Sequence, residues 1–64
     1  MTHKTMKSAL REIKTNLAAM NNREGKNDPK RWAVLEFGAI MIGHGDSPAH
    51  RELKNIAEAN EYLS

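Results

Sequence analysis

The chain has 64 residues, no cysteine and a formal net charge of +2. This length is enough for one domain. The lack of cysteine excludes disulfides and thiolate zinc sites, yet a core of this size supplies only about 3–5 kcal/mol and needs a further stabilising element. With three histidines and no cysteine a structural metal is poorly supported. We therefore expect association with another copy to supply the further stabilisation.

No segment has the pattern of a membrane span or an export signal. The longest apolar region, residues 32–42, is interrupted by Glu36 and is shorter than the ~20 residues that cross a bilayer. The N-terminus is polar and basic, without the apolar stretch and cleavage site of a secretory signal. We therefore expect a soluble, cytoplasmic protein with no membrane partner.

Charge is distributed unevenly along the chain. Residues 1–31 contain eight lysines and arginines against three acidic residues, which gives +5, whereas residues 32–64 contain two against five, which gives −3. Such asymmetry indicates an anionic partner or head-to-tail packing between copies.

Apolar residues spaced by four, three, four and three predict a first helix over about residues 4–22. Thr2 or Thr5 can cap its start, and Asn21 and Asn22 lead into a glycine-containing polar loop that ends it. The apolar stripe consists of Met6, Leu10, Ile13, Leu17 and Met20.

A second helix is predicted over about residues 29–43. Asp28 can serve as its N-cap and Pro29 as its first residue. A fully buried strand is the competing interpretation, but the length of the segment and helix formers such as Ala33 and Leu35 favour a helix. Its apolar residues would lie all round the helix and need cover from a second copy or a partner: Trp32, Val34, Leu35, Phe37, Ile40, Met41 and Ile42.

A third helix is predicted over about residues 48–63. Gly43 and Gly45 can end the second helix, and Asp46, Ser47 and Pro48 can begin the third. Its stripe is Ala49, Leu53, Ile56, Asn60 and Leu63. The sequence thus predicts an all-α fold, a bundle of three helices completed by oligomerisation.

Four basic residues on the first helix recur at three, four and three. Their mutual repulsion costs about a few tenths of a kcal/mol per pair, which contact with phosphates or an acidic surface would offset. The alternative is an ordinary solvated face. We define the basic ridge as Lys4, Lys7, Arg11 and Lys14.

The turn after the second predicted helix is a candidate anion site, because helix N-termini present free N–H groups. Its residues are His44, Gly45, Ser47 and His50. Pure capping is the alternative, since no phosphate-loop motif is present and Asp46 would repel an anion. The histidines lack a recognised ligand spacing, so we predict neither metal nor cofactor.

The predicted oligomer interface follows from the second and third helices. Asn60, a polar residue within an apolar stripe, would fix the register between copies, the alternatives being an exposed edge of the stripe or a ligand contact. The interface set is Trp32, Leu35, Phe37, Ile40, Ile42 and Asn60.

These patterns favour a non-catalytic helical binding or accessory protein, such as an inhibitor, since no nucleophile with its base is recognisable. It would act as a homo-oligomer and present the basic ridge to an acidic protein surface, a nucleotide or a nucleic acid. The alternative is a DNA-binding transcription regulator of helix-turn-helix type formed by residues 29–43 and 48–63. The excess of acid over base in the last helix weighs against it.

Overall fold

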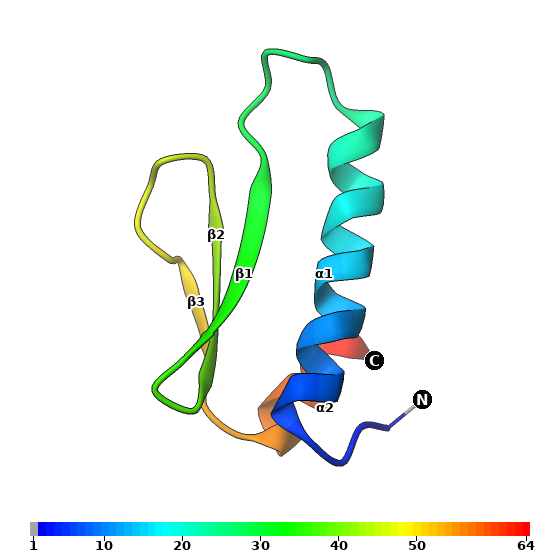
Figure 1. Cartoon of the computed structure of the whole chain (residues 1–64), viewed down its shortest axis with the longest axis vertical. Coiled ribbons are helices and arrows are strands. Elements are labelled where there is room, and N and C mark those ends of the chain that lie inside the picture. The colour runs from blue at the N-terminus through cyan, green and yellow to red at the C-terminus, as the bar shows by residue number, and fades with distance from the viewer. Residues whose placement is uncertain (1) are drawn as a thin grey trace.

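The structure is a computed structural model that describes residues 2–64. It contains two helices and one three-stranded antiparallel sheet of order β1-β2-β3 (Figure 1). The elements are, in chain order, α1 (Met6–Arg23), β1 (Arg31–Glu36), β2 (Ala39–His44), β3 (Arg51–Leu53) and α2 (Ile56–Leu63). The chain therefore has an α+β fold.

The predicted all-α bundle is wrong, although α1 forms over most of the first predicted helix and begins two residues later than predicted. The second predicted helix is a β-hairpin, and the third is divided between β3 and the shorter α2. A helix-turn-helix needs helices at both of those places, so the chain lacks the unit on which the transcription-regulator alternative depended.

The hairpin forms because residues 37–38 can make a two-residue turn. Phe37 and Gly38 have φ of 52° and 77°, and positive φ at both positions is typical of the type I′ turn that joins twisted strands. Glu36 pairs directly with Ala39 across this turn. The apolar residues predicted to surround a helix are instead distributed over the two faces of this sheet.

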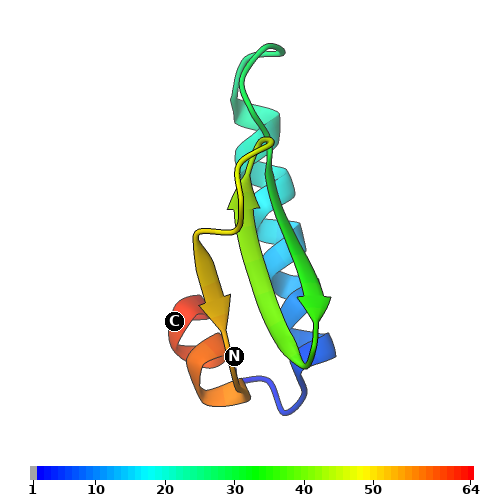
Figure 2. The same cartoon turned by 90° about the vertical axis from the view of Figure 1, so that its left-hand side faces the viewer.

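The core lies between the helices and one sheet face. Register places Ile40 opposite both Leu35 and Leu53, and Ile42 opposite Ala33. Figure 2 looks onto the other face, which no helix covers. The buried core comprises Ala9, Ile13 and Leu17 of α1, Ala33, Ile40, Ile42 and Leu53 of the sheet, and Ala59 of α2.

Side-chain caps begin both helices. Thr5 accepts the backbone N–H of Ser8 at the start of α1 (3.1 Å). Asn55 accepts that of Glu58 at the start of α2 (2.9 Å), and the Glu58 carboxylate accepts the N–H of Lys54 (3.2 Å). These reciprocal bonds explain why α2 begins after Asn55 and not at Pro48.

Two asparagine side chains bind backbone segments distant in sequence. The Asn60 amide accepts the N–H of His3 (2.8 Å) and donates to its carbonyl (2.9 Å). The Asn21 amide does the same with Arg31, at 2.9 and 3.0 Å. Asn60, predicted to set an oligomer register, therefore holds the N-terminal segment of its own chain.

Trp32 lies across Gly43 on the open sheet face. The two residues are cross-strand partners, and a Cβ atom at residue 43 would overlap the indole ring. The indole Nε1–H donates to the Gly45 carbonyl at 2.9 Å. A glycine is needed at residue 43 because the ring occupies the space of a side chain.

Candidate functional site

The basic ridge runs along exposed positions of α1, and its last member, Lys14, lies beside Leu17 at the border of the core. Lys7, Arg11 and Lys14 are exposed on the helix, and Lys4 is exposed just ahead of it. The structure thus brings Lys7, Arg11 and Lys14 together along one side of α1, whereas Lys4 lies in the segment that precedes the helix.

No carboxylate neutralises this ridge within the part of the chain that the structure describes. The ion pairs there are Arg31 with Glu24 and, when the histidine is protonated, His3 with Glu12. Glu12 is the only acidic residue on α1, and it is turned toward His3. The ridge keeps its full positive charge available to another molecule.

Two shallow hollows accompany the ridge, each of about 370 Å³. Hydroxyl groups of Thr5, Ser8 and Thr15 also line these hollows, and each already has one partner within the chain: the Ser8 N–H, the His3 ring and the Arg11 carbonyl, respectively. Ammonium, guanidinium and hydroxyl groups together are typical of contacts with phosphates and carboxylates. The first hollow is lined by Thr5, Lys7, Ser8 and Arg11, and the second by Lys7, Leu10, Arg11, Lys14 and Thr15.

His3 joins the N-terminal segment to α1. Its ring Nδ1 lies 2.5 Å from the Ser8 hydroxyl and its Nε2 lies 2.5 Å from a Glu12 oxygen. Hydroxyl, imidazole and carboxylate follow one another in serine hydrolases, but the Ser8 N–H that could stabilise an oxyanion already donates to Thr5. The cluster holds the segment that carries Lys4 against α1. The i, i+4 spacing of Ser8 and Glu12 was its only signal in the sequence.

A narrow groove separates α1 from β1. It encloses about 250 Å³. The small side chains of Ala18 and Ala33 leave this space, and Lys14 of the basic ridge stands at its border. The groove is lined by Lys14, Leu17, Ala18, Asn21, Arg31, Trp32 and Ala33.

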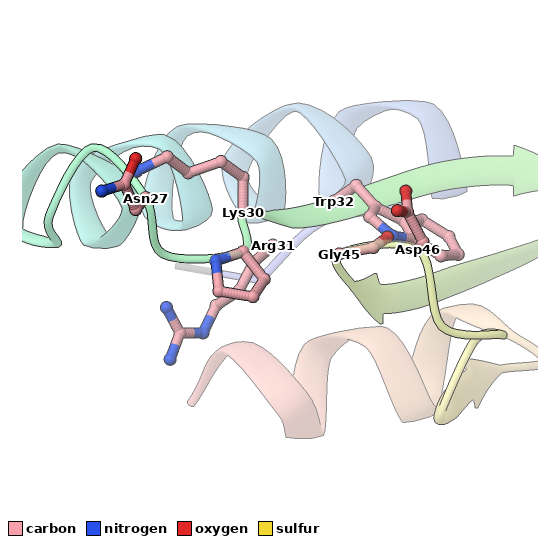
Figure 3. A pocket seen from close by; sticks show the side chains of 7 residues that line it. Asn27, Lys30, Arg31, Trp32, Gly45 and Asp46 are labelled. Atoms are coloured by element: carbon pink, nitrogen blue, oxygen red, sulfur yellow. The ribbon is translucent and has the colours of Figure 1, made fainter.

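A wider hollow of about 480 Å³ lies where the 24–30 loop meets the end of β2 (Figure 3). Its cations are already engaged: Lys30 donates to the carbonyls of Asn21 (3.3 Å) and Gly25 (3.1 Å), and Arg31 pairs with Glu24. Asp46 adds negative charge to it. This hollow is less suited to an anion than the ridge. Its lining is Asn27, Pro29, Lys30, Arg31, Trp32, Gly45 and Asp46.

The predicted anion turn follows a strand and does not start a helix. The Gly45 N–H donates to the Lys30 carbonyl (2.7 Å) and the His50 N–H to that of Ile42 (2.9 Å). His44 contacts the Pro29 carbonyl through Nε2 (2.8 Å), and Ser47 is exposed. These bonds occupy two of the backbone N–H groups that an anion would need. Residues 2–64 contain no cluster of three metal-binding side chains.

The predicted interface residues are divided between the core and the surface. Ile40 and Ile42 are 0% and 2% exposed, so they cannot meet a second copy. Leu35 and Phe37 are 42% and 98% exposed, and Trp32 is half-buried. Only the exposed members remain available for association.

Within residues 2–64 neither helix has the length and apolar character of a membrane span. A scan of protein-family models finds no match to this chain, and searches of curated proteins and of solved structures find none either.

Proposed function

We propose that the chain is a non-catalytic binding protein that docks the basic ridge of α1 on an anionic partner. The observation that carries this proposal is the row of exposed Lys7, Arg11 and Lys14 on α1, with Lys4 exposed just ahead of the helix and no carboxylate partner for any of them in residues 2–64. Like charges in a row repel one another, and an anionic surface would relieve that repulsion. A cytoplasmic location belongs to the same proposal.

The ridge can be tested by charge reversal with a matched control. The double variant Lys7→Glu, Arg11→Glu should bind fluorescent poly-glutamate or duplex DNA at least about tenfold more weakly, because tenfold corresponds to only about 1.4 kcal/mol. The control Arg23→Glu, Lys26→Glu changes the net charge equally at two exposed cations away from the ridge and should bind nearly as the parent does. Fluorescence anisotropy at several salt concentrations measures both.

Equal losses in the two double variants would mean that net charge alone drives binding. Unchanged binding in both would leave the ridge as a solvated face. Circular dichroism should show the parent helix content in every variant, since all four substituted residues are exposed.

We also propose that the open sheet face mediates homodimerisation. Antiparallel sheets with a solvated face usually present polar residues there, but the middle of this face carries Trp32, Val34 and Met41, with the charged Glu36 and Glu52 beside them by register. The accessible surface of 4759 Å² exceeds the about 4,100 Å² expected for a compact monomer of this mass. A second copy covering this face would leave both basic ridges outward.

Val34→Lys should shift the chain toward monomer, because Val34 is 39% exposed on that face and a lysine there would need to be desolvated. Analytical ultracentrifugation at tens of micromolar would show the change. The parent melting temperature should rise with concentration, as expected for folding coupled to association. A parent that sediments as a 7.2 kDa species at all concentrations would contradict dimerisation.

A further inference from the structure

The outer edge of β1 carries backbone groups that the sheet does not pair. The Gly45 N–H bonds to the Lys30 carbonyl, which identifies 30 and 45 as a hydrogen-bonded pair of the β1–β2 ladder. Because such pairs alternate along an antiparallel ladder, residues 32, 34 and 36 also face β2, and residues 31, 33 and 35 turn their N–H and C=O groups outward.

One of these three outward positions is already blocked. The Asn21 amide occupies both backbone groups of Arg31, as a neighbouring strand would. No other group within residues 2–64 bonds the outward groups of Ala33 and Leu35. Ala33 is only 5% exposed on the floor of the α1–β1 groove, and a buried backbone group without a partner costs as much as a lost hydrogen bond.

The two edges of the sheet differ in their protection. β3 has three residues, two of which are the charged Arg51 and Glu52, and short charged edges resist pairing. β1 has six residues with charges only at its ends. Leu35 faces the helix side, opposite Ile40, yet is 42% exposed. β1 is therefore the edge open to another strand.

We propose that an extended acidic segment of a partner protein adds to the edge of β1 and lies along the α1–β1 groove. The proposal rests on the proposed function, since it names the class of anionic partner. Backbone pairing with Ala33 and Leu35 would provide affinity, as in other cases of strand addition. Lys14, at the border of the groove, would pair with a carboxylate of the segment.

Charge complementarity selects an acidic segment over a second copy. Pairing β1 with the β1 of another copy about a two-fold axis would place both α1 helices on the same side of the joined sheet. Their Lys14-bearing sides would then approach, and like charges disfavour that contact. Nucleic acid can contact the cations but has no peptide backbone to continue the ladder.

Strand geometry also defines the side chains of the segment. Successive residues of a strand point to opposite faces, so alternate positions face α1 with Lys14 and the others extend the open face beside Trp32 and Val34. The best-matched segment alternates acidic and apolar residues.

The test uses a short fluorescent peptide of alternating glutamate and valine. Leu35→Pro removes an outward N–H without breaking a bond to β2, and proline is tolerated at such edge positions. Leu35→Ala removes the same side chain but keeps the N–H. We expect Leu35→Pro to weaken peptide binding at least about tenfold beyond the effect of Leu35→Ala. In the parent, hydrogen exchange at the Ala33 and Leu35 amides should slow when the peptide binds, a readout that does not depend on the variant folding.

Three outcomes decide between the proposals. Peptide binding that is equal in both Leu35 variants, with unchanged exchange at Ala33 and Leu35, would overturn strand addition and leave the ridge function intact. Binding of duplex DNA without binding of the peptide would also overturn it. Protection of both amides that survives Lys7→Glu, Arg11→Glu would support strand addition while removing the ridge function.

Discussion

Replacement of Ile40 by alanine is expected to unfold most of the protein at 25 °C. Ile40 is fully buried in the central strand, between Leu35 and Leu53. Large-to-small changes at such positions cost about 2–5 kcal/mol, and a core of this size supplies only about 3–5 kcal/mol in total. Circular dichroism during urea unfolding would measure the loss.

Ile40→Val is the matched control, since it removes one methyl group and should cost only about 0.5–1.5 kcal/mol. The pair also distinguishes a core residue from the interface residue that the sequence predicted. If Ile40 were at an interface between copies, Ile40→Ala would weaken association and leave a folded monomer, which analytical ultracentrifugation with circular dichroism would show. A melting temperature equal to that of the parent would contradict the core position.

The first helix could be predicted because its apolar stripe has a period that only a helix satisfies. The same period placed the basic ridge, which the structure shows on the exposed side of α1. Its exposure follows from local spacing alone. What the ridge binds depends on another molecule and stays a proposal.

The hairpin could not be predicted from periodicity because both faces of its strands are apolar. Ile40 and Ile42 face the core, whereas Trp32, Val34 and Met41 face outward. A strand that is apolar on both faces and a helix that is apolar all round give the same continuous apolar run in the sequence. The Phe37–Gly38 turn also differs from the Asn-Gly or Asp-Gly pairs that mark hairpins.

The start of α2 had a usable signal in the sequence. Asn55 followed by Glu58 is close to a capping box: Asn55 makes the expected bond to the Glu58 N–H, and the Glu58 carboxylate accepts the N–H of Lys54, one residue before the cap. The contact of Asn60 with His3 had no signal in the sequence, because the two residues are 57 positions apart in the chain. Such pairings follow from the folded topology and not from local pattern.

Because the second predicted helix is a β-hairpin, its apolar residues imply a different surface for association. A helix that is apolar all round would need other elements to cover it on several sides. A sheet that is apolar on both faces needs only two covering layers, and the helices form one of them. The case for a partner therefore moves from Ile40 and Ile42 to the open face. Trp32 dominates that face, and its position depends on one glycine.

Replacement of Gly43 by alanine should displace the Trp32 ring from the sheet. A Cβ atom at residue 43 would overlap the indole, while the φ of Gly43 is not positive, so the cost is steric and not conformational. Overpacking of this kind costs about 1–3 kcal/mol. The displaced ring would also lose its hydrogen bond to Gly45.

Trp32 is the only tryptophan in the chain, so its fluorescence reports the displacement without ambiguity. Gly43→Ala should shift the emission to longer wavelength, because the ring becomes more exposed to water, and should lower the melting temperature. Gly25→Ala is the control: its Cβ would meet only Asp28, at an ordinary 3.4 Å, and neither reading should change. An unshifted emission maximum in Gly43→Ala would mean that the ring does not lie on Gly43. The open face would then lack the flat apolar surface on which the proposed dimer depends.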